Sequence, residues 1–467
     1  MSPAATAPAA SVNGAQPLPY WLDDPARPEP LPALQSDATA DLVVVGGGYA
    51  GLWAALRAKE RDPGRRVTLV DSGACGDGGS GRNGGFVDPS LTHGFGNGLS
   101  RWPDEMPELL RLGSANLAGL VETVRRYDID CHLEHSGELL VATRPHEVEA
   151  IADEVAEAGR YGRDLRLLDG DQTQARVHSP TYLAGRYDPE VVLVEPARLA
   201  WGLRRACLDL GVEVHEHTAV TGLERDGQHI ALRAAAATVR ADQVVLATSA
   251  TKPLLRRLRP MTVPVLDYAL MTEPLSSEQR AAVGWVGREG IGDAGNLFHY
   301  YRLSRDDRLL FGGYDAVYRF GGRAGDGQQH GGPTHQLLAQ HLIETFPQLE
   351  GIAVTHAWGG VIDTCTRFCA FYGTALGGKV AYASGYTGLG IAGTRFAADV
   401  CLDLLDATPT ERTALEMVRR QPLPFPPEPL RWLGIQATRR SMARADTTGT
   451  PNLWLRTLER FGLGFDS

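Results

Sequence analysis

The chain has 467 residues, of which 43% are hydrophobic and 22% charged, which is ordinary for a globular protein and long enough for two or three domains with buried cores. A formal net charge of −10 without a compensating basic block argues against a nucleic-acid partner. The six cysteines form no CxxC pair and have no zinc-like spacing, which predicts reduced thiols, a cytoplasmic location and no metal site.

Residues 1–36 are rich in Ala and Pro. They contain neither a signal-peptide pattern nor a stretch long enough to cross a bilayer, and we expect no membrane span. The segment is predicted to be an extended arm in which only Tyr20-Trp21-Leu22 docks on the rest of the chain.

The stretch from Asp41 to Asp71 predicts a βαβ unit. An apolar run of strand type leads into a glycine cluster, a helical pattern covers 52–61, and a second strand ends on Asp71. Asp71 stands about twenty residues beyond the last glycine, where a carboxylate can accept hydrogen bonds from an adenosine ribose.

The glycines in this unit have the spacing Gly46-x-Gly48-x-x-Gly51. Gly46 permits a tight turn, Gly48 lets a pyrophosphate approach the backbone, and Gly51 lets the helix pack closely on the strand. The phosphates would contact amides at the helix start, around Tyr49 and Ala50. The alternative, in which the glycines only shape a turn, is disfavoured because both strands, the helix and the acid are in register.

A second glycine-rich stretch runs from Ser72 to Phe86. So many glycines after a dinucleotide-binding unit indicate that the backbone passes close to a flat or charged group. A flexible linker is the alternative, but a linker would not need the Arg82-Asn83 pair.

The segment Ser80-Gly-Arg-Asn-Gly-Gly85 resembles a signature of the D-amino acid oxidase superfamily of FAD-dependent oxidoreductases, in its branch of glycine oxidase and γ-glutamylputrescine oxidase-like enzymes. The resemblance implies an α/β fold, α+β overall, in which a Rossmann-type FAD-binding domain is interleaved with a mainly antiparallel substrate domain. In that family the loop runs along the ribityl chain and isoalloxazine ring, which implies cofactor contacts at Ser72, Ser80, Gly81, Arg82, Asn83, Gly84 and Gly85.

Between residues 99 and 249 the pattern predicts helices at 99–126, 145–161 and 196–211 and strands at 137–143, 191–194, 212–220 and 241–249. By resemblance, the strand at 212–220 contacts adenine near Val220. Ala247 and Thr248 lie near the carboxyl end of the last strand, where open α/β sheets bind ligands. His215 and His217 would share one strand face, and solvated histidines are favoured over a metal pair because no further ligand accompanies them.

Residues 261–345 have a different pattern, with strands predicted at 263–271, 296–303 and 308–314. By resemblance, this antiparallel sheet forms the floor of the substrate cavity over the flavin. Gly292-Asp293 is predicted to be a turn that opens a strand and hairpin. The alternative is the flavin-ribose motif that aromatic hydroxylases place between a strand and a helix.

The stretch from His356 to Asp363 resembles the Trp-Gly-Gly strand that lies next to the flavin in the family. The family continues with an arginine, an aspartate and a proline, whereas this chain continues Thr-Cys-Thr-Arg-Phe-Cys-Ala at 364–370, which leaves the substrate open. Monomeric sarcosine oxidases attach flavin through a cysteine in this region. The nearest match to it falls in the Trp-Gly-Gly stretch and not on Cys365, so we predict non-covalent FAD.

A strand that starts at Lys379, a glycine-rich turn and a helix at 392–405 again place backbone amides at a helix start. By resemblance, the turn meets the pyrimidine edge of the flavin, where the helix dipole stabilises the anionic reduced ring. The implied contacts are Gly385, Thr387, Gly388, Leu389, Gly390 and Ile391.

The predicted organisation comprises an arm at 1–36, an FAD-binding domain at 37–98, 196–260 and 350–420, a substrate-binding domain at 99–195 and 261–349, and a helical extension at 421–467. In the extension, a linker at 422–429 precedes helices at 430–445 and 452–461. These helices cover the cavity, meet a partner subunit or simply pack, and simple packing is favoured.

The resemblance implies oxidation of a small amine or amino acid, with hydride transfer to flavin N5 and hydrolysis of the resulting imine. The cofactor carries the chemistry, so no dedicated side-chain base is required. The alternatives are a dehydrogenase of the same fold that uses an acceptor other than oxygen, and a flavoprotein without catalysis. Asp363 is the candidate anchor for a substrate ammonium, and the candidate cavity residues, about half of which would be core residues, are Tyr268, Phe298, Tyr300, Trp358 and Tyr386.

Lysine occurs only at Lys59, Lys252 and Lys379. Sarcosine oxidases use a lysine near flavin N5, on the strand after the cavity hairpin, to promote the reaction with oxygen. The corresponding stretch here, 309–314, has none, and Lys379 is expected on a solvent-exposed hairpin. We therefore expect slower reoxidation by oxygen than in lysine-bearing relatives, because superoxide forms as an anion in a dry site.

Overall fold

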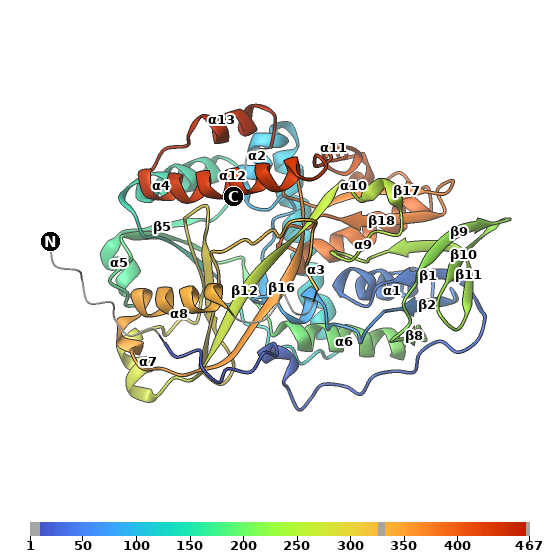
Figure 1. The fold of residues 1–467 in the computed structure, drawn as a ribbon, viewed down its shortest axis with the longest axis horizontal. Coiled ribbons are helices and arrows are strands. Elements are labelled where there is room, and N and C mark those ends of the chain that lie inside the picture. The colour runs from blue at the N-terminus through green and yellow to red at the C-terminus, as the bar shows by residue number, and fades with distance from the viewer. Residues whose placement is uncertain (1–9, 326–331, 464–467) are drawn as a thin grey trace.

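The computed structural model describes residues 10–325 and 332–463, in which two β-sheets occupy opposite halves of the molecule (Figure 1). The first sheet has the strand order β17-β18-β11-β1-β2-β8, and the β9–β10 ribbon pairs with β11. Its five central strands are parallel, as expected where helices connect them. The strands are β1 (Ala38–Val45), β2 (Val67–Val70), β8 (Glu213–His215), β9 (Gly222–Asp226), β10 (His229–Arg233), β11 (Thr238–Leu246), β17 (Phe371–Ala375) and β18 (Val380–Ser384).

Alternate residues of β1 pack into opposite layers of this domain. Leu42 and Val44 face a helical layer, whereas Val43 and Val45 face the β9–β10 ribbon. Both faces of the strand are therefore buried, which explains its unbroken apolar sequence. The helices are α1 (Tyr49–Arg61), α3 (Met106–Arg126), α6 (Pro196–Asp209) and α9 (Ile391–Leu405).

The second sheet has the strand order β16-β12-β15-β14-β13-β4-β6-β5 and is antiparallel except where β4 meets β13. Helix α8 (Pro333–Thr345) covers one face, with Leu338 packed among Leu266 and Leu270 of β12. The predicted fold class is confirmed. The strands are β4 (Glu138–Ala142), β5 (Arg166–Leu168), β6 (Ala184–Asp188), β12 (Thr262–Pro274), β13 (Gly290–Asp293), β14 (His299–Leu303), β15 (Arg308–Gly313) and β16 (Val354–Cys365).

Smaller elements fill the edges of the two sheets. Strand β3 (Phe86–Val87) follows the glycine-rich loop and pairs with β7 (Val192–Leu193). The remaining helices are α4 (Pro145–Arg160), α5 (Gly170–Gln174), α7 (Ser277–Val283), α10 (Glu411–Ala414) and α11 (Glu416–Arg419).

The single helix predicted at 99–126 is wrong. The chain forms α2 (Phe95–Arg101), a 3-10 turn at Pro103–Glu105 and then α3. Trp102 has φ −137° and ψ 55°, because a residue that precedes proline is disfavoured in the α region. The proline therefore ends the first helix.

The strand predicted at 212–220 ends early, at His215. The buried carboxylate of Glu216 turns the chain away because it accepts hydrogen bonds from the amides of Leu31 at 2.5 Å and Cys75 at 2.8 Å. His217 then adopts a left-handed φ of 51°. The two histidines do not share a strand face.

Strand β13 was missed from the sequence, and Gly292-Asp293 ends this strand instead of opening one. The Asp293 carboxylate accepts the amide of His299 at 2.9 Å and so closes the hairpin to β14, which begins at His299 and not at 296. The element after Gly292-Asp293 is a strand and not a helix, which agrees with the predicted hairpin and not with the flavin-ribose motif of aromatic hydroxylases.

The segment predicted as cofactor domain at 350–420 is divided between the sheets. Strand β16 pairs with β12 from Val354 to Cys365 and is the edge of the second sheet, whereas β17 and β18 belong to the first. The sequence did not reveal this because the partner strand lies about 90 residues earlier in the chain.

The N-terminal arm docks over more of its length than predicted. Trp21 and Leu22 are 3% exposed, as expected, but Ala10 and Leu34 are also buried. The Gln16 amide donates to the carbonyl of Thr355 at 2.8 Å, so the arm extends the edge of the second sheet.

The C-terminal extension forms α12 (Leu430–Thr448) and α13 (Leu453–Arg460) after a linker without regular structure. Asp446 of α12 accepts the amides of Asn296 at 2.8 Å and Leu297 at 3.1 Å, and Arg439 forms an ion pair with Asp315. The Asp446 contacts fasten α12 to the β13–β14 hairpin, and the Arg439 ion pair fastens it to the segment after β15. Within 10–325 and 332–463, no helix has both the length and the apolar character that membrane crossing requires.

Candidate active site

A cavity of about 2340 Å³ separates the two sheets and is lined by segments from both. Small-molecule sites usually measure roughly 300–1,000 Å³, so this space can hold a dinucleotide together with a substrate. Its walls come from the carboxyl ends of β1, β2 and β11, from the glycine-rich loop, from β12, β14 and β16, and from the turn before α9. This is the edge where open α/β sheets bind ligands.

The three glycines of the first loop differ in what surrounds them. A methyl group on Gly51 would stand 1.8 Å from the carbonyl oxygen of Gly46, and one on Gly46 would stand 2.3 Å from that of Ala247. A methyl group on Gly48 would meet only the Ser80 hydroxyl, at 3.0 Å, and Gly48 borders the cavity. Gly46 and Gly51 are therefore required by the backbone, whereas Gly48 leaves a surface open to a ligand.

Asp71 and its neighbours lie at the end of β2. The Asp71 carboxylate accepts the Gly47 amide at 2.5 Å and the Gly73 amide at 2.7 Å, and burial raises the pKa of this group. It lines the cavity, so its contact with a ribose stays a prediction. Ser72, Val220, Ala247 and Thr248 line the same end, together with Tyr49 and Ala50 of α1.

The glycine-rich loop is held by the side chain of Asn83. Its Nδ2 donates to the carbonyls of Gly79 at 2.9 Å and Ser80 at 3.0 Å, and its Oδ1 accepts the Gly85 amide at 2.9 Å. The Ser80 hydroxyl in turn accepts the first amide of α1, at Tyr49, at 2.9 Å. The loop is thus joined to the first glycine turn.

Two tryptophans donate hydrogen bonds to the backbone of this loop. Trp21 donates from Nε1 to the carbonyl of Asn83 at 3.0 Å, and Trp358 donates from Nε1 to that of Arg82 at 2.9 Å. The Trp358 side chain is 1% exposed and so positions the loop.

Arg302 supports the loop from below. This fully buried side chain donates to the carbonyl of Val194 at 2.7 Å, and burial lowers its pKa to about 10. Its Nη2 lies 3.6 Å from the carboxylate of Glu134.

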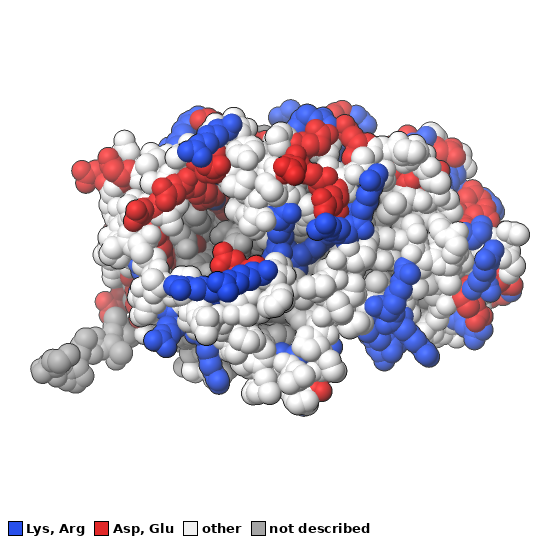
Figure 2. Space-filling view, turned by 90° about the horizontal axis from the view of Figure 1, so that it is seen from above, with Lys and Arg blue, Asp and Glu red and all other residues white. Residues whose placement is uncertain are grey.

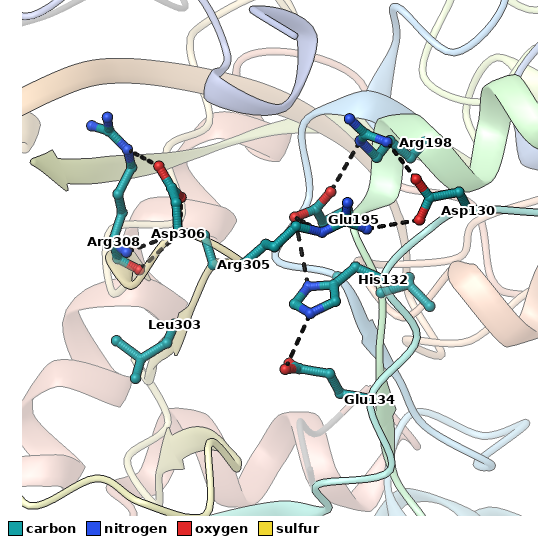
Figure 3. Close-up of polar contacts among 12 residues, drawn as sticks. Asp130, His132, Glu134, Glu195, Arg198, Leu303, Arg305, Asp306 and Arg308 are labelled. Atoms are coloured by element: carbon teal, nitrogen blue, oxygen red, sulfur yellow. Dashed lines mark hydrogen bonds and ion pairs between the residues drawn. The ribbon is translucent and has the colours of Figure 1, made fainter. Parts of the chain in front are cut away.

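Glu134 belongs to a cluster of charged side chains beside Arg302. Figure 3 shows His132 of this cluster between two carboxylates, with its Nε2 3.5 Å from Glu134 and its Nδ1 3.7 Å from Glu195.

The turn at 385–391 depends on Asp363. The buried Asp363 carboxylate accepts the Gly385 amide at 2.6 Å and the Ser384 hydroxyl at 3.3 Å, and burial raises its pKa to about 6. Its carbonyl accepts the Thr387 amide at 3.2 Å. The carboxylate is therefore engaged by the turn, and the expectation of a free ammonium anchor at Asp363 has no support from this geometry.

Three of the residues predicted to contact the cofactor do not line the cavity. Gly51, Gly81 and Gly385 are not among the lining residues. A methyl group on Gly81 would stand 2.4 Å from the carbonyl oxygen of Gly76, and one on Gly385 would stand 2.9 Å from the Cys365 side chain. They permit close packing, while the other predicted contacts in the loop and turn line the cavity: Ser80, Arg82, Asn83, Gly84, Gly85, Thr387, Gly388, Leu389, Gly390 and Ile391.

The predicted aromatic residues all line the cavity but differ in their other contacts: Tyr268, Phe298, Tyr300, Trp358 and Tyr386. Tyr268 packs edge-on to His335 of α8, in the core behind the second sheet. Tyr386 belongs to the apolar cluster of the cofactor domain. The Tyr300 hydroxyl pairs with a cavity carboxylate.

That carboxylate is Asp267, which the sequence reasoning missed. It lines the cavity and accepts the Tyr300 hydroxyl at 2.7 Å. The signal was present, because Asp267 is the single charged residue in the otherwise apolar stretch 263–271.

His93 was also missed from the sequence. Its Nε2 lies 2.8 Å from the carbonyl oxygen of Thr387, and burial lowers the pKa of the imidazole.

The C-terminal helices form part of the cavity wall. Leu433 and Met442 of α12 and Trp454 of α13 are among the lining residues. Figure 2 looks onto the face that carries these helices in Figure 1, where basic and acidic side chains frame a hollow. Of the alternatives weighed from the sequence, covering the cavity agrees with this placement.

Comparisons with known proteins agree with the fold. A family model described as FAD dependent oxidoreductase matches residues 41–404. The chain is 28% identical to the probable oxidoreductase OrdL of Rhizobium meliloti (strain 1021), over 86% of this chain and 90% of that protein. It is 29% identical to gamma-glutamylputrescine oxidoreductase of Escherichia coli (strain K12), over 87% and 92%. The crystal structure of glycine oxidase from Geobacillus kaustophilus shares the fold, with a TM-score of 0.67 at 19% identity over 82% of this chain and 99% of that chain.

Proposed function

Because this chain belongs to the family of FAD-dependent oxidoreductases, we propose that it oxidises a C–N bond of an amine or amino acid with non-covalently bound FAD. The observation that carries the proposal is the single cavity that joins three glycine-bearing segments to β12, β14 and β16. The likeness to an oxidoreductase named for γ-glutamylputrescine supports the same class of reaction.

The residues of the cavity fit this cofactor at each of its parts. Gly48 and the α1 amides would hold the pyrophosphate, the loop from Ser80 to Gly85 would follow the ribityl chain and ring, and the amides before α9 would meet the pyrimidine edge. FAD, when bound, would supply a hydride acceptor at N5. The substrate carbon would lose a hydride and the substrate nitrogen would lose a proton, which leaves an imine. Water would then convert this imine to a carbonyl compound and an amine or ammonia.

The chain's own side chains would position these groups. Trp358 and Asn83 fix the loop beside the ring, and Asp363 fixes the turn at the pyrimidine edge. None of the cysteines, all of which lie in the described part of the chain, lines the cavity. Cys365 is fully buried and donates from Sγ to the carbonyl of Cys369 at 3.1 Å, which supports non-covalent attachment.

The electron acceptor separates an oxidase from a dehydrogenase, and the lysines favour slow reaction with oxygen. Lys59 is buried against the carbonyls of Pro63 and Arg65, and Lys379 lies in the turn between β17 and β18, at the opposite end of β18 from Gly385. Lys252 is exposed and lines the cavity after Ala247 and Thr248, the residues assigned to the dinucleotide. These positions support the proposal that no lysine stabilises superoxide at the flavin ring.

We expect reoxidation of the reduced protein by oxygen to be about tenfold or more slower than in relatives with a lysine at flavin N5, because a fixed cation there stabilises the developing anion. Stopped-flow mixing of photoreduced holoprotein with oxygen measures this rate. Fast reoxidation that survives Lys379→Met would show that oxygen activation here needs no lysine.

The proposed reaction is tested by adding a library of amines and amino acids to the holoprotein without oxygen. Bleaching of the flavin by any of them supports an enzyme of this class. A flavoprotein without catalysis, the remaining alternative, would stay oxidised with every compound while still accepting electrons from dithionite.

A further inference from the structure

One wall of the cavity carries a carboxylate without a cationic partner. Asp267 lies in β12 opposite Gly360 of β16, and its Oδ2 accepts the Tyr300 hydroxyl at 2.7 Å. Within residues 10–325 and 332–463, no arginine, lysine or histidine forms an ion pair with it. The side chain is partly exposed although it lies deep in the molecule, because it borders the cavity.

Tyr300 places this carboxylate beside the glycine-rich loop. A methyl group on Gly84 of the loop would stand 2.8 Å from the Tyr300 ring, and one on Gly312 of β15 would stand 2.7 Å from it. On the other side, a methyl group on Gly360 would stand 3.7 Å from the Cβ of Arg82. The Asp267–Tyr300 pair therefore lies at the end of the cavity where this loop, the segment expected to follow the flavin ring, meets β16.

Two other carboxylates that line the cavity, Asp363 and Asp293, are already engaged. Asp363 accepts the Gly385 amide, and Asp293 accepts both the His299 amide and, at 2.6 Å, its ring Nδ1. Asp267 has only the Tyr300 hydroxyl and a backbone hydrogen bond from Tyr268. An anion that the protein largely shields from bulk water and that has so few partners is unfavourable, and a bound cation relieves this cost.

The charge on Asp267 depends on pH in a defined direction. Burial raises its pKa to about 6, although the hydrogen bond from Tyr300 lowers it. The carboxyl group is therefore largely ionised at pH 8, above this pKa, and largely neutral at pH 5.

The four arginines that line the cavity are committed to the protein itself, which bears on how a substrate carboxylate is received. The lining lysine, Lys252, follows Ala247 and Thr248 at the end of the cavity assigned to the dinucleotide. Between Trp358 and Cys365, β16 contains neither arginine nor lysine. Four lining arginines have partners on the chain: Arg82 with the carbonyl of Asp77 at 2.8 Å, Arg186 with Glu154 at 3.0 Å, Arg431 with the carbonyl of Pro426 at 2.9 Å, and Arg439 with Asp315.

We infer that Asp267, oriented by Tyr300, receives the ammonium group of the substrate, so that the site selects amines whose reacting carbon carries no carboxylate over α-amino acids. A charge-assisted hydrogen bond from the ammonium would complete the partners of Asp267. An α-carboxylate would instead meet the negative charge of Asp267 without an arginine to balance it. The inference rests on the proposed function and specifies the substrate class of the same site.

The test uses tert-butylammonium, whose nitrogen-bearing carbon has no hydrogen and so cannot be oxidised. The holoprotein at pH 8 is titrated with it and, separately, with the anion pivalate, which carries the same tert-butyl group, and the flavin absorbance reports binding. The cation is expected to bind the wild type at least about tenfold more tightly than pivalate, since an ionised carboxylate attracts one and repels the other.

Two variants locate the effect. Asp267→Asn keeps the size and can still accept from Tyr300, and it is expected to weaken tert-butylammonium binding by roughly 10- to 100-fold. Asp293→Asn removes another carboxylate of the same cavity, one that already accepts hydrogen bonds from His299. It should change the affinity for tert-butylammonium by less than about threefold. Flavin content and dithionite reduction verify that both variants are intact.

The inference is overturned if pivalate binds the wild type as tightly as the cation, if the cation produces no response, or if Asp267→Asn binds it as well as the wild type does. The comparison of tert-butylammonium with pivalate uses only the wild type, so it tests the inference even if Asp267→Asn loses FAD. Failure of the proposed function looks different, because cation binding through Asp267 would persist while no amine bleaches the flavin. If amines bleach the wild type and Asp267→Asn with equal constants, the function stands and the inference fails.

Discussion

Gly48→Val protein is expected to be folded but colourless, with FAD affinity reduced by at least roughly 10- to 100-fold. Gly48 precedes α1, and a methyl group there meets only the flexible Ser80 hydroxyl. The rest of the valine side chain would project into the space assigned to the pyrophosphate. Overpacking costs about 1–3 kcal/mol, and about 1.4 kcal/mol corresponds to tenfold in Kd.

The measurement is the FAD released into the supernatant after heat denaturation. Wild-type protein should release its flavin completely, because the cofactor is expected to be non-covalent. Gly159→Val is the matched control, since no heavy atom lies within 4 Å of a methyl group added there, and it should keep its FAD. Flavin on the precipitated wild-type chain would contradict the non-covalent assignment, and normal flavin content in Gly48→Val would contradict the assignment of this loop.

Asp363→Ala is expected to weaken FAD binding by roughly 10- to 100-fold without abolishing the fold. The substitution removes the carboxylate that accepts the Gly385 amide at 2.6 Å and leaves that amide without its acceptor. Hydrogen bonds to charged groups contribute about 1.5–3 kcal/mol, and the turn that they hold is proposed to meet the cofactor. Titration of apoprotein with FAD, followed by quenching of flavin fluorescence, gives the change in Kd.

Asp363→Asn separates the hydrogen bond from the charge, because an amide oxygen can still accept from Gly385. It should bind FAD more tightly than Asp363→Ala. Equal FAD affinity in Asp363→Ala and the wild type would show that the turn does not depend on this carboxylate.

The local features near the first glycine turn could be predicted from the sequence. The order of strand, turn, helix and strand between Ala38 and Val70 follows from short-range patterns, and the glycine spacing carries a physical requirement at each position. Steric tests at Gly46 and Gly51 agree with the roles assigned to them. These predictions succeeded because the patterns on which they rest are close in the sequence, although a methyl group on Gly46 would meet the carbonyl of the distant Ala247.

The substrate side of the site could not be predicted in the same way. Tyr268 and Asp267 are neighbours in one strand and face opposite sides, so the choice between them depends on which face α8 covers. Asp363 and Gly385 meet only because β16 joins the second sheet, and this depends on pairing with a strand about 90 residues away. Aromatic character selected residues that line the cavity, among them Tyr268 and Tyr386, but it did not reveal Asp267, the lone acid in an apolar strand.

The central claim is oxidation of a C–N bond by the bound flavin, and a single turnover without oxygen tests it most directly. Oxidised holoprotein is mixed at pH 8 with a primary amine that bleaches the flavin, and the carbonyl product is quantified against the flavin reduced. The account predicts one carbonyl for each flavin, with little or no reduction by α-amino acids. Flavin that stays oxidised with every amine and amino acid, yet is reduced by dithionite, would contradict it.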